Sequence, residues 1–417
     1  MEAFTYINGE LCCEEVPLSK IAESADTPFY VYSKAKLLDS FESFNNAFGE
    51  VPHKVCFSTK ANGNLAVLHT LVSAGAGLDI VSGGELYRGL KAGADPKKVV
   101  YSGVGKRRSE IEYALKTGIM MFNVESQAEL DVIDEVAGRL NTKAPIALRV
   151  NPDVDPKTHP YISTGLKTAK FGIPMDEAVD EYKRAMGLKH IEVVGVDCHI
   201  GSQLTTIEPF VEAIRRLRPL IEELKSIGAP IKYLDLGGGL GIRYNEENPP
   251  SMEEYAKAVI DNTKDLGLEL VFEPGRSIAG NAGALITRAL YNKTNEDKKF
   301  TIVDAAMNDL IRPMLYKSYH NIVPVTEPTS SERAVVDLVG PICETGDCFG
   351  GERELPLIDR GELVAILSAG AYGYTMASNY NARPRPAEVM VSGGRYEIVR
   401  KRETYEDLLR GESISKF

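Results

Sequence analysis

The sequence predicts an α/β protein in which a (β/α)8 barrel is combined with an all-β domain. Between about residues 50 and 280, short apolar runs rich in β-forming residues alternate with helical patterns. After Gly283, strand-like runs continue without long helical stripes. A chain of 417 residues is also longer than one core usually allows. We therefore expect an N-terminal segment (1–49) that contributes to the β domain, a barrel (50–283) and a C-terminal β domain (284–417).

The apolar runs of the first region are the predicted barrel strands. Several are continuous rather than alternating, as expected of parallel strands covered on both faces. Eight strand–helix pairs fit a (β/α)8 barrel better than a six-stranded open sheet, and an open doubly wound sheet is the alternative. The runs are Lys54–Thr59, Leu78–Val81, Val99–Ser102, Ile119–Val124, Ile146–Val150, Val193–His199, Tyr233–Leu236 and Leu268–Phe272.

Capping boxes mark the expected starts of several helices between these strands. In such a box a Ser or Thr is followed three residues later by Glu, and each side chain binds the other residue's backbone N–H. The boxes begin at Ser82, Ser109, Ser126 and Thr205. Each is predicted to be a helix N-terminus.

The β domain is predicted from runs on both sides of the barrel. Pro28–Tyr32 is strand-like and is followed by a short helical pattern over Lys34–Phe48, so the N-terminal segment is expected to complete this domain. The later runs are Ala284–Tyr291, Phe300–Val303, Ala334–Val339, Glu362–Leu367 and Glu388–Val391.

Charge and composition favour a small-molecule partner. The chain has 48 Lys and Arg against 59 Asp and Glu, a formal net charge of −11, which disfavours nucleic acid or an anionic membrane. It shows neither a secretion signal nor an apolar run long enough to span a bilayer. Six cysteines without paired CxxC spacing predict reduced thiols and no metal site. We expect a cytoplasmic protein.

Reactive side chains follow the predicted strands. In a (β/α)8 barrel the active site lies at the carboxyl ends of the strands. There the sequence places an amine, an arginine, a histidine, a glycine-rich loop, an acid and a second arginine. In order, these are Lys60, Arg149, His199, Gly237–Gly239, Glu273 and Arg276.

This set suits pyridoxal phosphate. The cofactor needs an amine for its aldehyde, a cradle for its phosphate and an acid at its pyridine nitrogen, which Lys60, Gly237–Gly239 with Arg276, and Glu273 would supply. Each residue also has a plainer interpretation. Lys60 could be a surface cation, the glycines a tight turn, Glu273 a structural partner of Arg276, and His199 a core histidine.

Taken together, the motifs resemble the barrel-type, alanine-racemase-like pyridoxal phosphate decarboxylases, and within them the diaminopimelate decarboxylases. The resemblance extends from Pro28-Phe-Tyr-Val-Tyr to Tyr372-Gly-Tyr-Thr-Met-Ala-Ser-Asn-Tyr380. It implies pyridoxal 5'-phosphate as cofactor and decarboxylation of meso-2,6-diaminopimelate to L-lysine and CO2, the last step of lysine biosynthesis by the diaminopimelate route.

The resemblance also implies roles in the barrel. Lys60 would hold the cofactor's aldehyde covalently, His199 would pack on its ring and Glu273 would face its pyridine nitrogen. Phosphate would be held by Ser202 and the glycine loop, with Gly275 and Arg276 completing the phosphate and substrate contacts. Asp79 and Arg149 resemble the family's inner-shell residues. The cofactor-binding set is Lys60, Asp79, Arg149, His199, Ser202, Gly237, Gly238, Gly239, Glu273, Gly275, Arg276 and Tyr372.

Further implied roles fall in the β domain. Arg312 and Tyr316 would bind the substrate's distal carboxylate, Cys343 would be the acid and Glu344 would meet the distal ammonium. Tyr372 would approach phosphate and substrate. The family usually has Ser at the position of Thr345. The Cys343 loop would reach the neighbouring subunit's barrel, which implies a homodimer with shared active sites, and Tyr161–Gly172 resembles a mobile flap.

Rival functions follow from the same residues. The rivals with the same fold are decarboxylases of ornithine, arginine or carboxynorspermidine; the Arg312–Tyr316 motif disfavours the first two. A racemase is disfavoured because Glu273, rather than an arginine, is expected at the ring nitrogen. A non-catalytic, regulatory relative is disfavoured by the presence of Lys60, Cys343 and Glu344.

Overall fold

The computed structural model describes residues 1–155, 159, 164–165 and 169–417. Its packing divides into a unit of residues 40–243 and 247–278 and a unit of residues 1–39, 244–246 and 279–417. Residues 40–49 lie with the first unit because Phe44 and Phe48 pack on Phe272, with ring centroids 5.6 and 4.3 Å away. The domain boundaries predicted from the sequence, between residues 49 and 50 and between residues 283 and 284, stay predictions.

The first unit is a closed parallel barrel, which confirms the predicted fold class and excludes the open sheet. Among the described residues, eight parallel strands pair in chain order, and the last pairs with the first in the register Leu270↔His53. Each predicted run overlaps a barrel strand. The strands are β5 (His53–Ser58), β6 (Gly77–Ile80), β7 (Val99–Tyr101), β8 (Met121–Val124), β9 (Ala144–Asn151), β11 (Ile191–Asp197), β12 (Tyr233–Asp235) and β13 (Glu269–Phe272).

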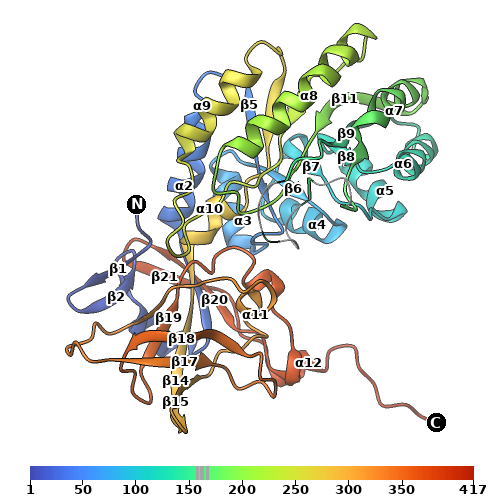
Figure 1. Ribbon diagram of the computed structural model, residues 1–417. Coiled ribbons are helices and arrows are strands. Elements are labelled where there is room, and N and C mark those ends of the chain that lie inside the picture. The colour runs from blue at the N-terminus through green and yellow to red at the C-terminus, as the bar shows by residue number, and fades with distance from the viewer. Residues whose placement is uncertain (156–158, 160–163, 166–168) are drawn as a thin grey trace. The chain divides into compact units, whose positions relative to one another are not determined.

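Helices follow the strands and surround the barrel (Figure 1). The short strand β10 (Ile173–Pro174) pairs with β9, and a 3-10 turn (Pro96–Lys98) precedes β7. The helices are α2 (Lys34–Ala47), α3 (Leu65–Ser73), α4 (Gly83–Lys91), α5 (Arg108–Thr117), α6 (Gln127–Arg139), α7 (Met175–Gly187), α8 (Glu208–Ser226), α9 (Met252–Thr263) and α10 (Arg276–Ala279).

Half of the predicted helix starts are confirmed. The Ser82 and Ser126 hydroxyls cap α4 and α6 by accepting from the backbone N–H three residues later. The prediction at Ser109 is wrong because Glu110 binds the Arg107 N–H and the helix begins at Arg108. The prediction at Thr205 is also wrong, because α8 begins at Glu208 without a side-chain cap.

Small and medium apolar side chains fill one end of the barrel interior. Cys56, Val100, Met121, Ala147 and Val271 belong to one buried cluster, to which β5, β7, β8, β9 and β13 contribute. The polar residues of the barrel interior therefore lie towards the carboxyl ends of the strands.

The second unit is built on a mixed sheet whose central strands come from both ends of the chain. The N-terminal strand β4 (Phe29–Ser33) lies between β14 (Gly283–Asn295) and β20 (Ala387–Ser392). This confirms that the segment Pro28–Tyr32 contributes to the β domain. The other strands of the sheet are β15 (Lys298–Val303), β16 (Ile322–Pro324), β17 (Arg333–Val339), β18 (Cys348–Pro356), β19 (Leu363–Ile366) and β21 (Arg395–Arg400).

Short elements complete this unit. A small antiparallel sheet joins β1 (Phe4–Ile7), β2 (Glu10–Cys13) and β3 (Val16–Pro17), and α1 (Leu18–Ala25) follows it. Helices α11 (Arg312–Tyr316) and α12 (Tyr405–Leu408) and 3-10 turns at Gly280–Ala282, Tyr374–Met376 and Tyr380–Ala382 lie in the loops. Among the described residues, no helix has both the length and the apolar character that crossing a membrane requires.

Candidate functional site

The closed barrel gathers the predicted site residues at the carboxyl ends of its strands. Lys60 lies two residues beyond β5, His199 two beyond β11 and Gly237 two beyond β12. Glu273 directly follows β13. Because parallel strands end at the same rim, residues far apart in the sequence come to lie around one opening.

Lys60 forms an ion pair with Asp79. The carboxyl group of Asp79 is fully buried on β6, whereas the Lys60 side chain is 35% exposed. Asp79 also accepts a hydrogen bond of 2.8 Å from the Ser58 hydroxyl. The amine is therefore held at the mouth of the barrel by a fixed, buried carboxylate, with part of its side chain open to an incoming molecule.

His199 is held as a neutral ring. The Gly238 N–H donates to its Nδ1 at 3.2 Å, so Nδ1 is the acceptor and the ring proton is on Nε2. Burial, and then the nearby Arg149 and Lys60 cations, hold the pKa of His199 well below its usual range. A neutral imidazole with one nitrogen fixed by a backbone bond presents a flat, uncharged face.

The glycine loop packs closely against its neighbours. A Cβ at Gly237 would lie 2.4 Å from His199 Nδ1, and one at Gly238 would lie 2.3 Å from the Glu273 carbonyl oxygen. Gly237 also has φ +63° and Gly239 φ +109°, which a side chain would strain. The tight-turn interpretation therefore holds, and the same turn leaves backbone N–H groups uncovered by side chains.

Ser202 and Arg276 are in direct contact at the same rim. The Arg276 Nη2 donates to the Ser202 hydroxyl at 3.0 Å, and Arg276 is buried at the start of α10. Gly275 immediately precedes it. A guanidinium, a hydroxyl and backbone N–H groups are the donors that bind a phosphate.

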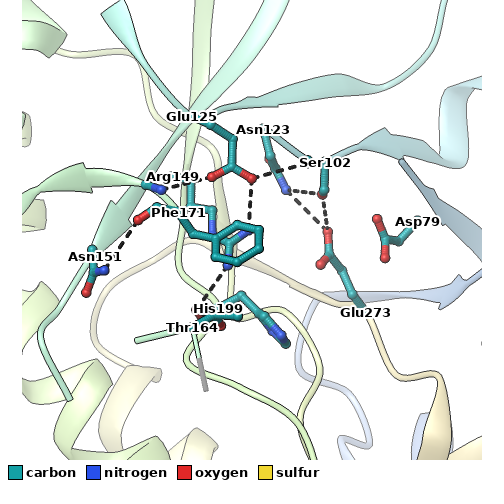
Figure 2. A network of polar contacts seen from close by, with 12 residues as sticks. Asp79, Ser102, Asn123, Glu125, Arg149, Asn151, Thr164, Phe171, His199 and Glu273 are labelled. Carbon is teal, nitrogen blue, oxygen red and sulfur yellow. Dashed lines mark hydrogen bonds and ion pairs between the residues drawn. The ribbon is translucent and has the colours of Figure 1, made fainter. Parts of the chain in front are cut away.

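Glu273 accepts two side-chain hydrogen bonds on one oxygen. Ser102 donates to Oε1 at 3.0 Å and the Asn123 amide donates to the same atom at 3.2 Å (Figure 2). Burial, and then the nearby Asp235 and Asp79 carboxyls, raise the pKa of Glu273 well above its usual range. Without a partner, these surroundings favour the neutral form of Glu273. A cation beside Glu273 would favour its negatively charged form.

Arg149 joins a second polar network, drawn in Figure 2. It pairs with the buried Glu125 at 2.9 Å, donates to the His199 carbonyl at 3.2 Å and lies 4.8 Å from the Phe171 ring. Glu125 also accepts from the Gly172 N–H at 2.9 Å. Half of the predicted flap, Tyr161–Gly172, lies outside the described residues, and the flap stays a prediction.

In the β unit, aromatic rings surround Arg312. Its guanidinium lies 5.2 Å from the Tyr244 ring and 5.8 Å from the Tyr316 ring. Arg312 Nε donates to His320 Nε2 at 3.4 Å, while His320 Nδ1 contacts the Leu367 carbonyl at 2.8 Å. The carbonyl accepts, so the ring proton is on Nδ1 and Nε2 accepts from the arginine.

Cys343 and Glu344 lie in the loop between β17 and β18. Cys343 is exposed, and Glu344 accepts a hydrogen bond of 3.0 Å from the Tyr380 hydroxyl. The buried Asp347 fixes the loop by accepting from the Ile342 N–H at 2.8 Å and the Met307 N–H at 2.7 Å. Tyr372 follows β19 with φ +56°, in the left-handed region.

Several residues of the barrel network were not predicted from the sequence. Ser102 follows β7, Asn123 lies in β8, Glu125 follows β8 and Asp235 ends β12. Active-site residues of such a barrel lie at the carboxyl ends of its strands. The ends of the third and fourth predicted runs point in this way to Ser102, Asn123 and Glu125. His320 and Tyr244 carry no such signal, because their contact with Arg312 depends on the folding of loops.

Comparison with known proteins agrees with this geometry. Residues 34–280 match the family model described as "Pyridoxal-dependent decarboxylase, pyridoxal binding domain". A diaminopimelate decarboxylase of Pseudomonas aeruginosa is 54% identical over 99% of both chains, and one of Vibrio cholerae is 52% identical over 99% of both.

Solved structures give the same result. The diaminopimelate decarboxylase of Helicobacter pylori complexed with L-lysine has a TM-score of 0.91 and 42% identity, covering 94% of this chain and 98% of that one. The enzyme of M. jannaschii in complex with L-lysine has a TM-score of 0.94 and 38% identity, covering 99% and 98%. From its fold, its strand-end residues and these relatives, the chain belongs to the diaminopimelate decarboxylase family of pyridoxal-dependent decarboxylases.

Proposed function

We infer that this chain uses pyridoxal 5'-phosphate to decarboxylate meso-2,6-diaminopimelate to L-lysine and CO2, the last step of lysine biosynthesis by the diaminopimelate route. The observation that carries this inference is the amine of Lys60 and the acid of Glu273 on neighbouring barrel strands, in a chain about half identical to curated diaminopimelate decarboxylases. The L-lysine in the two related complexes matches the proposed product.

The barrel residues fit the cofactor. Donors for a phosphate lie on Ser202, Arg276 and the glycine loop, where any added Cβ would clash with the backbone or with His199. The buried Asp79 Oδ1 has no hydrogen-bond partner among the described residues, although Oδ2 is paired with Lys60. An amine, a neutral flat ring, an acid and an anion cradle are the groups that such a cofactor requires.

Each barrel residue then has a task. When bound, the cofactor supplies an electron sink that accepts the electron pair left on the α-carbon as CO2 departs. Lys60 would supply the amine that holds the cofactor's aldehyde. Glu273 would hold a proton at the pyridine nitrogen, and the neutral His199 ring would pack on the cofactor without opposing its positive charge.

The β-unit residues are proposed to select the substrate and return a proton. Arg312, held by His320 and flanked by Tyr316, would bind the distal carboxylate, with Arg276 at the reacting end. Glu344 would bind the distal ammonium, and the exposed Cys343 would donate its Sγ proton to the α-carbon after CO2 leaves. Tyr372 would contact phosphate and substrate. Ornithine and arginine lack the distal carboxylate, so neither would offer the buried Arg312 a carboxylate to bind, and both would be disfavoured.

We further propose a homodimer in which the Cys343 loop of one subunit serves the barrel of the other. The exposure of Cys343 and the anchoring of its loop by Asp347 agree with a rigid loop that reaches outward. A cytoplasmic location agrees with the six cysteines, all of which are free thiols. An acidic chain that binds a small amino acid needs neither nucleic acid nor a membrane as partner.

The proposed function is tested by measuring CO2 release and lysine formation from meso-diaminopimelate with and without added pyridoxal phosphate, for the wild type and for Lys60→Ala. We expect the variant to lose visible cofactor absorbance and at least about a thousandfold in turnover, because covalent catalysis is removed. Borohydride reduction of the wild type should attach the cofactor to Lys60. Lys54→Ala, within β5 and paired with Glu269, is the control and should keep both label and activity. A label on another lysine would contradict the assignment.

Replacement of Arg312 tests the substrate assignment. We expect Arg312→Met to lower kcat/KM for meso-diaminopimelate about a hundredfold, because a paired charge is lost, and to leave cofactor affinity nearly unchanged. The four candidate substrates, meso-diaminopimelate, ornithine, arginine and carboxynorspermidine, should be assayed side by side. An unchanged order of preference would place the specificity elsewhere.

Mixed dimers test whether the active sites are shared. Lys60→Ala and Cys343→Ala are each expected to be nearly inactive, yet co-expression should restore about a quarter of wild-type activity, because half of the dimers then contain one intact site. The control pair is Lys60→Ala with His199→Ala, both in the barrel, which should restore nothing. Heterodimers seen by native mass spectrometry without recovered activity would show that each site is built from one chain.

A further inference from the structure

A chain of buried polar side chains joins the glycine loop to Glu273. Asp235 accepts from the Gly237 N–H at 2.9 Å through Oδ1 and from the Asn123 amide at 3.1 Å through Oδ2. Asn123 also donates to Glu273 at 3.2 Å, and Ser102 donates to Glu273 at 3.0 Å. Asp235 and Asn123 are fully buried, and Ser102 and Glu273 are almost so.

The donors meet at one oxygen of the acid. Both Ser102 and Asn123 bind Oε1 of Glu273, as Figure 2 shows. No hydrogen bond from the described residues reaches Oε2. Because the two donors fix the plane of the carboxyl group, the other oxygen is left for a donor outside the protein.

These donors also act on the charge of the acids that they contact. Burial and the neighbouring Asp235 and Asp79 raise the pKa of Glu273, and the Lys60 cation and then the bond from Ser102 lower it. Burial and Asp197 raise the pKa of Asp235 to about 8, and the bonds from Gly237 and Asn123 lower it. A hydrogen bond donated to a carboxyl oxygen favours the charged form of that acid, as the bond from Ser102 does at Glu273 and the bond from Asn123 does at Asp235.

Packing alone does not explain Asn123. Its Oδ1 is buried and has no hydrogen-bond partner within the described part of the chain. An unpaired buried amide oxygen destabilises a fold, and an apolar residue of similar size would avoid that penalty. The Nδ2 group of Asn123 lies within hydrogen-bond distance of oxygens of Ser102, Asp235 and Glu273. Among the residues that the structure describes, all the side-chain hydrogen bonds of Asn123 are therefore made by its donor nitrogen.

We propose that Asn123 and Ser102 are positioning residues that hold Glu273 charged and oriented, with Oε2 reserved for the pyridine nitrogen of the cofactor. Asp235 anchors Asn123 and the glycine loop together, so the acid and the loop proposed to bind phosphate are set by one hydrogen-bonded chain. The inference rests on the proposed function only in taking pyridoxal phosphate as the partner of Glu273.

The test uses holoenzyme loaded with pyridoxal phosphate labelled with 15N in its ring. The 15N chemical shift reports whether the ring nitrogen carries a proton, whatever the catalytic rate. We expect the wild type to show the protonated shift, and Asn123→Leu and Ser102→Ala to move it towards the unprotonated value. Turnover should fall about tenfold to a hundredfold with little change in KM, since a hydrogen bond to a charged group is lost.

Matched variants separate positioning from loss of structure. Ser102→Thr keeps the hydroxyl and should keep the protonated shift. Thr263→Val removes a different buried hydroxyl, which donates to the Val259 carbonyl on α9 at 2.9 Å, and should leave both shift and turnover unchanged. If Asn123→Leu does not fold, Ser102→Ala against Ser102→Thr carries the comparison.

The outcomes distinguish this inference from the proposed function. A protonated shift in both Asn123→Leu and Ser102→Ala would overturn the positioning role even if turnover fell. A wild type that binds the cofactor but forms no lysine from meso-diaminopimelate would overturn the proposed substrate, and the 15N comparison would still decide the role of Asn123. A wild type that binds no pyridoxal phosphate would overturn both.

Discussion

Pairing of the last barrel strand with the first is the constraint on which the site depends. β13 pairs with β5, and just beyond that ladder the Ser58 N–H donates to the Pro274 carbonyl at 3.0 Å while its hydroxyl donates to the Glu273 carbonyl at 2.8 Å. These bonds fix the chain that carries the acid against the chain that carries the amine. Lys60 and Glu273, distant in the sequence, thereby become neighbours.

The barrel also concentrates negative charge. Asp79, Asp197, Asp235 and Glu273 are all buried at or near strand ends. Burial is the largest cause of the raised pKa values of Asp197, Asp235 and Glu273. Such an interior is costly to the fold and well suited to a cofactor whose pyridine ring must stay positive. The buried acids therefore lower the stability of the fold at the place where the chemistry needs groups that bind a cation.

Much of this architecture could be predicted because parallel strands that are buried on both faces have continuous apolar sequences. Each of the eight runs overlaps a strand, and the N-terminal run enters the β sheet as expected. Strands such as β21 (Arg395–Arg400) were missed because polar side chains dominate them, and β18 because it contains Gly350 and Gly351. The capping signal failed at Ser109, where Glu110 binds a backbone N–H outside the expected box.

The site was predictable where strand ends alone define it, and less so where loops do. The positions of Lys60, His199 and Glu273 in the site can be predicted because each residue comes just after a barrel strand. The contact of His320 with Arg312 depends on how the loop after α11 folds, which the sequence pattern does not indicate. The pairing of Glu125 with Arg149 and Gly172 likewise joins segments whose proximity no local pattern encodes.

The position of β4 between β14 and β20 has a consequence for how the polypeptide is made. On the ribosome, the N-terminal strand emerges long before its two partners, and the whole barrel is synthesised in between. That apolar strand therefore has no neighbour in its sheet until β14 has been translated, and its second neighbour, β20, comes later still. The barrel can close during translation before the β unit that contains Arg312 and Cys343 is complete.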